Sequence, residues 1–332
     1  MTKNVLVTGG AGYIGSHCCK ALQLAGYRPV TFDSLTTGWA QAVRYGPFER
    51  GDLRDRARLD EVFARWRPEA VMHFAALSQV GEAMRDPGRY WRDNVNASLT
   101  LIEAATAAGC LDFIFSSTCA TYGDQDGVLL DEDSPQSPIN AYGASKRAIE
   151  DMLRDFGNAH GLRSVIFRYF NVAGADPEAE CGEFHDPETH LIPIILEVAS
   201  GERPTLTVFG EDYPTPDGTC IRDFVHVSDL VDAHLLGLKW LEAGRGNRIF
   251  CLGSGQGFSV REVIERARRL TNRPIPVVVG PRRRGDAAKL VSGSARATAE
   301  LGWTPTRSSL EAMITDAWRA YSSLDWPAAN PD

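Results

Sequence analysis

A glycine-rich turn after the first predicted strand constrains the fold more than any other feature of the sequence. The apolar run at residues 4–8 predicts a short strand, and a helical pattern begins at residue 16. The turn between them reads Gly9-Gly10-Ala11-Gly12-Tyr13-Ile14-Gly15. Glycines in such a turn permit a tight change of direction, let the backbone approach a pyrophosphate and allow close packing of helix on strand. Because a helix N-terminus also offers unpaired N–H groups to an anion, the turn predicts a dinucleotide-binding site.

An acidic residue at the end of the second predicted strand supports this interpretation. Asp33 lies about 20 residues after the turn, the usual separation for a carboxylate that accepts hydrogen bonds from an adenosine ribose. It would repel a 2′-phosphate, and no arginine follows it directly, so the predicted cofactor is NAD rather than NADP. Asp52 and Leu53 are expected near the adenine. The alternative is a turn that serves packing alone, with Asp33 as a helix cap.

Short apolar segments alternate with longer helical patterns through the first half of the chain. We expect strands at residues 4–8, 29–32, 70–74, 111–116 and 163–170. Helices are expected at residues 16–25, 56–66, 90–108 and 142–160. This alternation is typical of βαβ units, so the predicted fold class is α/β, with a doubly wound parallel sheet of the Rossmann type.

The alternation breaks down after about residue 174. Residues 176–187 and 210–218 are rich in proline and glycine and too irregular to continue a sheet. We therefore expect a smaller, mixed α/β lobe that binds the substrate, and a strand end and helix at 223–237 that return to the sheet. The expected division is an NAD-binding domain at 1–175 plus about 222–250, and a substrate lobe at about 176–221 and 251–332.

Composition excludes several classes of protein. A hydrophobic fraction of 43% is enough to build a core without disulfides, and a net charge of −8 argues against a nucleic-acid partner. The seven cysteines are scattered without disulfide or zinc spacing, so we expect a reducing cytoplasm and no metal. There is no charged leader and no run of about 20 apolar residues, so a soluble protein without a membrane partner is expected.

A tyrosine and a lysine stand four residues apart in one predicted helix. The sequence Tyr142-Gly143-Ala144-Ser145-Lys146 places a phenol and an amine on the same helix face. An alcohol that gives up hydride must also lose its proton, and free tyrosine, with a pKa of about 10, is a poor base. A nearby ammonium and an oxidised nicotinamide both favour the phenolate, and a shift of about three pKa units needs about 4 kcal/mol. We predict Tyr142 as the base and Lys146 as its partner, which also holds the nicotinamide ribose; the alternative is a surface pair on an amphipathic helix.

The segment after the fourth predicted strand supplies a third candidate. Residues 115–123 are rich in serine and threonine and lie at the carboxyl edge of the sheet, where open α/β folds bind ligands. Thr118 is predicted to hydrogen-bond the reacting oxygen of the substrate and to position its proton. The structural alternative is a plain Ser/Thr-rich turn.

Seven segments, in order along almost the whole chain, resemble the UDP-glucose 4-epimerase family of the extended short-chain dehydrogenase/reductase superfamily. They are residues 8–17, 73–82, 116–123, 142–146, 168–171, 222–229 and 281–286. The resemblance implies contacts to NAD from Gly9, Gly12, Tyr13, Ile14, Gly15, Asp33, Asp52, Leu53, Phe74, Ala75, Tyr142, Lys146 and Phe170. For a UDP-sugar it implies Asn171 and the arginines Arg222 and Arg283 at the phosphates, Leu191 and Phe209 around the uracil, and Asp286 at the uridine ribose.

This resemblance implies interconversion of UDP-glucose and UDP-galactose through a transient 4-keto sugar at bound NAD. The alternatives are a UDP-N-acetylglucosamine or UDP-pentose 4-epimerase, a nucleotide-sugar 4,6-dehydratase or decarboxylase, and a non-catalytic NAD-sensing protein. The chain departs from well-known members at Ser78, Asp93, His190 and Leu290. At the last position a tyrosine is replaced, which widens the space for the hexose. The family also implies a homodimer built through the helices at 90–108 and 142–160.

Overall fold

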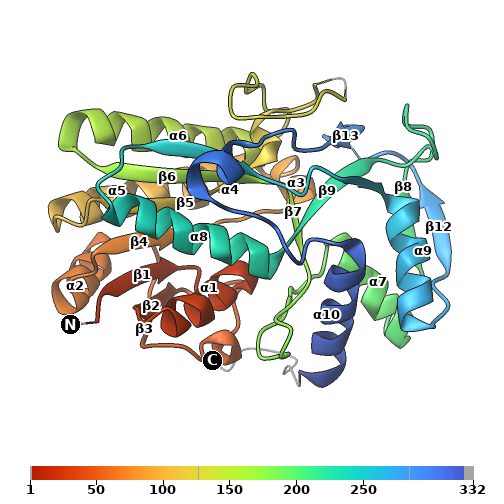
Figure 1. Cartoon of the computed structure of the whole chain (residues 1–332), viewed down its shortest axis with the longest axis horizontal. Coiled ribbons are helices and arrows are strands. Elements are labelled where there is room, and N and C mark those ends of the chain that lie inside the picture. Colours follow the sequence, from red (N-terminus) through yellow and green to blue (C-terminus); the bar gives the residue numbers. More distant parts are fainter. Residues whose placement is uncertain (1, 126, 284, 325–332) are drawn as a thin grey trace.

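The computed structural model describes residues 2–125, 127–283 and 285–324. Figure 1 shows two regions side by side: a large sheet with helices on both faces, and a second region that contains α7, α9, α10, β8 and β12. None of the described helices is long and apolar enough to cross a membrane.

Seven parallel strands form the main sheet, in the order β10-β6-β5-β4-β1-β2-β3. The strands are β1 (Asn4–Thr8), β2 (Arg28–Asp33), β3 (Phe48–Arg50), β4 (Ala70–His73), β5 (Asp112–Thr118), β6 (Arg163–Tyr169) and β10 (Arg248–Leu252). The order reverses between β1 and β4, and a doubly wound sheet opens its ligand crevice at such a point, beyond the carboxyl ends of the strands. The predicted fold class is confirmed.

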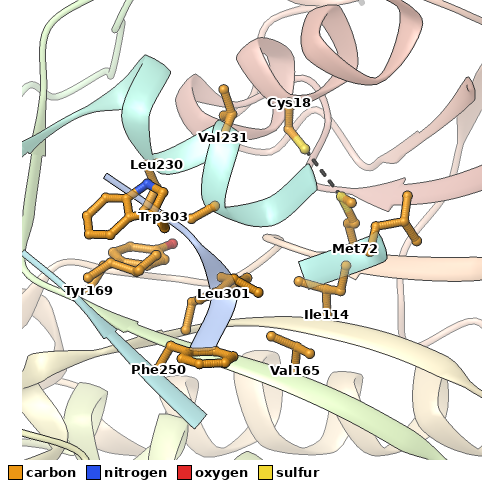
Figure 2. Close-up of a cluster of buried hydrophobic side chains, with 14 of the residues drawn as sticks. Cys18, Met72, Ile114, Val165, Tyr169, Leu230, Val231, Phe250, Leu301 and Trp303 are labelled. Carbon is orange, nitrogen blue, oxygen red and sulfur yellow. Dashed lines mark hydrogen bonds between the residues drawn. The ribbon is translucent and has the colours of Figure 1, made fainter. Parts of the chain in front are cut away.

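Helices cover both faces of this sheet. On one face lie α1 (Tyr13–Leu24) and α8 (Val227–Glu242), and on the other lie α2 (Arg56–Trp66), α5 (Ala97–Ala107) and α6 (Ala141–His160). Figure 2 shows the core under α1 and α8, where the Cys18 thiol donates to the sulfur of Met72 at 3.3 Å and Phe250 packs below Leu301. Cys18 is therefore a core residue, and all seven cysteines are free thiols.

One predicted helix is wrong in its continuity. Residues 90–108 are divided into α4 (Pro87–Tyr90), a π-helical stretch at Trp91–Asn96 and α5. The wider turn brings the buried Asn94 side chain to the backbone of Leu77, donating to its oxygen at 3.0 Å and accepting from its nitrogen at 2.8 Å. The tertiary hydrogen bonds of one amide side chain thus replace regular helix geometry, as π-bulges often do near functional sites.

At residues 223–237 we predicted a strand end and a helix that return to the main sheet. The helix does so, but the strand does not. β9 (Ile221–His226) pairs with β7 (Asn171–Ala173), β11 (Gly257–Ser259) and β13 (Lys289–Leu290) in a separate four-stranded sheet. The helix α8 then packs on the main sheet, and β10 completes its edge. Just after Phe170 the chain turns out of the main sheet into β7. Because β9 pairs with β7, β9 also lies outside the main sheet.

The second region has its own apolar core. It packs α7 (Leu191–Ser200), α9 (Val260–Thr271) and α10 (Leu310–Ser323) against β8 (Leu206–Phe209), which pairs with β12 (Val277–Gly280). Shorter elements are α3 (Val80–Ala83), 3₁₀ turns at Ala40–Ala42 and Cys119–Thr121, and a π-helical turn at Ala297–Leu301. The segments at 176–187 and 210–218 lack helix and strand, as predicted. The division into an NAD domain and a substrate lobe at the residues given above stays a prediction.

Candidate active site

One cavity of about 970 Å³ runs along the carboxyl ends of the main-sheet strands and is walled on its far side by the second region. Every residue that the sequence predicted for the site lines it. These are Gly9, Gly12, Tyr13, Ile14, Gly15, Asp33, Asp52, Leu53, Phe74, Ala75, Thr118, Tyr142, Lys146, Phe170, Asn171, Leu191, Phe209, Arg222, Arg283 and Asp286. Residues from more than ten separate elements and loops therefore meet around one space.

The glycine turn forms the floor at one end of the cavity. A β-carbon on Gly15 would lie 2.1 Å from the carbonyl oxygen of Gly9, so only glycine lets helix α1 approach strand β1 this closely. A β-carbon on Gly12 would meet only that same oxygen, at 3.3 Å, and otherwise open space. Gly12 is the N-cap of α1, and no side chain of the described residues caps the helix. The first amides of α1 thus face an open cradle of the kind that binds a pyrophosphate.

Asp33 lies beside this cradle as predicted, at the end of β2. Its carboxylate accepts hydrogen bonds from the backbone nitrogens of Ala11 at 3.0 Å and Leu35 at 2.9 Å. It caps no helix, so the packing alternative for this residue is not supported by the geometry. Burial raises its pKa, and these two hydrogen bonds oppose the shift. The cradle and the adjacent carboxylate fit the diphosphate and ribose of a dinucleotide.

Tyr142 and Thr118 stand together deeper in the cavity. Tyr142 is in the first turn of α6, whose N-cap Asn140 accepts a hydrogen bond from the amide of Gly143 at 2.8 Å. Burial raises the pKa of Tyr142 to about 12, and the Thr118 hydroxyl opposes the shift. The predicted lowering of this pKa needs an oxidised nicotinamide as well as Lys146, and in the protein alone burial outweighs the hydrogen bond from Thr118. A positively charged ring bound beside the phenol would act in the opposite direction.

Lys146 is buried one turn further along α6. Its Nζ atom donates to the carbonyl oxygen of Ser116 at 2.9 Å and lies 4.9 Å from the centre of the Phe115 ring. Burial lowers its pKa to about 7, and Glu150 opposes that shift. Burial therefore disfavours the ammonium form of this side chain in the protein alone. The amine remains well placed to donate hydrogen bonds into the cavity.

An ion pair that sequence reasoning missed fixes this helix to the sheet. Arg168 on β6 binds Glu150 on α6, with Nη2 to Oε2 at 2.7 Å, and both side chains are 5% exposed. The Glu150 carboxylate also accepts a hydrogen bond from the Ser117 hydroxyl. Glu150 follows Lys146 by four residues, so the pair positions the helix turn that carries the amine. The sequence did contain a sign of this ion pair, because Tyr142, Lys146 and Glu150 recur every four residues and so lie on one face of the helix.

Charged groups collect at the other end of the cavity. The charges of Arg222, Asp286 and Arg283 all act on the half-buried thiol of Cys220, and all four residues line this part of the cavity. The Arg283 guanidinium lies 4.5 Å from the centre of the Phe209 ring. Within the described part of the chain, neither arginine has an ion pair with a carboxylate. Two such guanidinium groups are suited to a diphosphate, which they bind with directional hydrogen bonds.

The residues that depart from the family also line the cavity. They are Ser78, Asp93, His190 and Leu290. Asp93 pairs with Arg54 at 2.9 Å, and Leu290 packs against a buried apolar cluster that includes Phe170, so both side chains contact other parts of the protein.

The sequence prediction also overlooked a set of four residues between β7 and α7. The pattern Glu183, His185, Glu188 and His190 repeats a Glu-x-His spacing, and the structure brings all four side chains together. The repeat of two metal-binding residue types at the same interval was the signal that could have revealed them.

The fold and the cavity together define a dinucleotide-dependent enzyme of the short-chain dehydrogenase type, with a Tyr-Lys pair and an adjacent anion site. The family model of the NAD dependent epimerase/dehydratase family matches residues 5–253. The chain belongs to this family.

Similarity to individual relatives extends over almost the whole chain. It is 49% identical to a UDP-glucose 4-epimerase of Rhizobium leguminosarum bv. trifolii, over 98% of this chain and 98% of that protein. It is 48% identical to a UDP-glucose 4-epimerase of Rhizobium meliloti, over 96% and 97%. The crystal structure of the UDP-glucose 4-epimerase of Brucella ovis in complex with NAD superposes with a TM-score of 0.93, at 46% identity, over 96% of this chain and 98% of that one.

Proposed function

We propose that this protein is a UDP-glucose 4-epimerase that interconverts UDP-glucose and UDP-galactose with tightly held NAD. One observation carries the proposal: the glycine cradle, the pair of Tyr142 and Thr118, and the arginines Arg222 and Arg283 all line the same cavity. A dinucleotide and a nucleotide-sugar can therefore meet at the phenol. The full-length similarity to three UDP-glucose 4-epimerases supports the same activity.

The chain's own residues divide the work between binding and proton transfer. When bound, NAD supplies the acceptor that takes a hydride from C4 of the sugar and later returns it. Tyr142 removes the proton of the 4-hydroxyl and gives it back, and Thr118 orients that oxygen. Lys146 holds the nicotinamide ribose, and the glycine cradle and Asp33 hold the diphosphate and the adenosine ribose.

Arg222 and Arg283 hold the UDP group while the 4-keto sugar turns to present its other face. The binding free energy must lie mainly on UDP, because a tightly held hexose could not rotate. Around the nucleotide we assign Asn171 to the diphosphate, Leu191 and Phe209 to the uracil and Asp286 to the uridine ribose. Their positions at the far wall of the cavity agree with these roles.

Two related activities remain alternatives for the same site. Leu290 leaves room for an N-acetyl group, which favours a UDP-N-acetylglucosamine 4-epimerase as the second candidate. A UDP-pentose needs the same polar contacts and less space. A 4,6-dehydratase is disfavoured because Cys119 and Ala120 follow Thr118, where elimination would need an acid.

Location and assembly are further parts of the proposal. A cytoplasmic enzyme agrees with seven free cysteines, of which six are buried. A homodimer would pair through α5 and α6, whose outer surfaces lie on the same face of the main sheet. Sedimentation of the purified protein at several concentrations tests this assembly.

The activity is tested with the purified protein and a panel of UDP-sugars, without added cofactor. We expect UDP-galactose to be converted to UDP-glucose, because NAD is retained through purification. UDP-N-acetylglucosamine and UDP-pentoses measure the substrate range in the same assay. Absence of conversion of every sugar, with NAD shown to be bound, would contradict the proposed function.

A further inference from the structure

Four metal-binding side chains converge at the wall of the cavity, three of them lining it, without taking part in the proposed reaction. Their ligand atoms all lie within 4.8 Å of one another. They belong to the segment between β7 and α7 and are Glu183, His185, Glu188 and His190. Two imidazoles and two carboxylates are a common ligand set of zinc and other divalent transition metals.

The distances between the ligand atoms are those of a metal site. His185 Nδ1 lies 3.6 Å from Glu183 Oε1 and 3.3 Å from Glu188 Oε2. His190 Nδ1 lies 3.2 Å from the same Glu183 oxygen, and one ligand atom from each of the four residues lies within 4.8 Å of the others. Four ligands placed about 2.0–2.1 Å from a tetrahedral zinc ion are about 3.3 Å apart, so an ion fits between these atoms with little movement.

In the described part of the chain, the carboxylates of Glu183 and Glu188 form ion pairs with no lysine or arginine. The side chains of Glu183 and Glu188 are 8% and 4% exposed, and within the described residues their ion pairs are with the two histidines alone. Buried carboxylates are costly unless they are paired or bind a metal, which a divalent ion would resolve here.

The backbone holds one of these ligands in place. Glu188 Oε1 accepts hydrogen bonds from the amides of Thr189 and His190, each at 2.7 Å. The second oxygen, Oε2, is the one that faces His185. Hydrogen bonds of this kind orient ligands in metal sites, so Glu188 is prepared to bind through Oε2.

A neighbouring acidic cluster provides a contrast within the same segment. Asp176, Glu178 and Glu180 also gather their carboxylates, but Lys20 lies among them at 2.8, 2.8 and 2.6 Å. There a lysine ammonium supplies the cation. The cluster of two glutamates and two histidines has no such lysine or arginine among the described ion pairs, so the partners of its carboxylates are the two imidazoles, which are themselves metal-binding groups.

We propose that Glu183, His185, Glu188 and His190 bind one divalent transition-metal ion, with zinc as the best match. This departs from the sequence-based expectation of no metal. The ion would fix the segment before α7 and thereby the wall that carries Leu191. Its role is structural, because the four ligands leave the proton-transfer residues Tyr142 and Thr118 untouched.

The proposal is tested by metal binding to the full-length protein after treatment with a chelator and dialysis. We expect titration with zinc to saturate at about one ion per chain, and cobalt to give the strong visible absorption of a tetrahedral complex. His185→Gln and Glu183→Gln should each weaken zinc binding by about tenfold or more. His160→Gln, which changes an exposed histidine on α6, should bind like the unchanged protein.

Circular dichroism of each variant distinguishes a lost ligand from a lost fold. Failure of the unchanged protein to bind zinc and cobalt would overturn the proposal without reference to any variant. Equal zinc affinity in folded His185→Gln and His160→Gln would overturn it as well. Neither result depends on epimerase activity, so the metal site and the proposed function can fail separately.

Discussion

Glu150 and Arg168 form an ion pair, with Nη2 2.7 Å from Oε2, that joins α6 to β6 in a place almost free of solvent. Arg168 also donates to the Tyr122 hydroxyl at 3.1 Å and to the carbonyl oxygen of Glu132 at 3.2 Å. The guanidinium is therefore fully engaged by the protein. Removing one partner leaves the other charge buried and unpaired, which costs more than the pair itself contributes.

We expect Glu150→Gln to lower the free energy of unfolding by about 3–5 kcal/mol, because the Arg168 charge would remain buried. Urea denaturation measures the change. The matched control is Asp151→Asn, which breaks the exposed pair with Arg154 on the same helix and should cost less than about 1 kcal/mol. Similar losses in both variants would show that burial of the first pair has no energetic consequence.

Tyr142→Phe should reduce kcat by about 10²–10⁴, because it removes the group that exchanges the sugar proton. NAD content and unfolding temperature should stay close to those of the unchanged protein. Tyr90→Phe is the control: its ring lies 6.5 Å from that of Tyr142, and its hydroxyl donates to the carbonyl oxygen of Gln79 instead of lining the cavity. Retention of full turnover by Tyr142→Phe would exclude the phenol as the base.

Sequence patterns predicted those parts of the molecule that depend on local chemistry. The helix at Arg56–Trp66 was predicted at its observed bounds, because Asp55 caps it and its apolar residues recur at helical spacing. The glycine turn and Asp33 were also correctly placed, since their spacing reflects one βαβ unit. Every predicted site residue lines the cavity, although which of them contact NAD and the sugar stays a prediction.

Features that depend on distant parts of the chain were missed. The π-helical stretch forms because the Asn94 side chain binds the backbone of Leu77, and no local pattern encodes that contact. The position of β9 depends on where β7 leaves the main sheet. The pKa of Lys146 falls because its amine is buried, and the sequence alone could not show that burial.

The lowered pKa of Lys146 makes stability depend on pH. The folded protein releases this proton near pH 7 and the unfolded chain near pH 10.5, so between these values the unfolded state binds more protons. The contribution of Lys146 to the free energy of unfolding should therefore rise by about 1–4 kcal/mol between pH 7 and pH 10.5. The measurement is the difference in unfolding free energy between the unchanged protein and Lys146→Met from pH 6 to 10. A constant difference would mean that the amine titrates alike in both states.

Arg283→Ala should raise the KM for UDP-galactose by about tenfold or more, because one guanidinium of the phosphate clamp is lost. NAD binding should be unchanged. Arg282→Ala is a close control, since Arg282 pairs with Asp212 and stacks on Tyr213 outside the cavity lining. Equal effects of the two substitutions on KM would argue against a specific phosphate contact at Arg283.

Leu290→Tyr should narrow the substrate range. Leu290 lines the cavity, packs against the apolar cluster that includes Phe170 and pairs in register with Arg222 across β13 and β9, so a larger ring here would occupy space next to the bound nucleotide-sugar. We expect kcat/KM for UDP-N-acetylglucosamine to fall by about tenfold or more, while that for UDP-galactose changes by less than about threefold. Leu290→Met, which nearly conserves volume, should leave both values unchanged. If the unchanged protein has no activity on UDP-N-acetylglucosamine, the added space at Leu290 does not determine the sugar that is accepted.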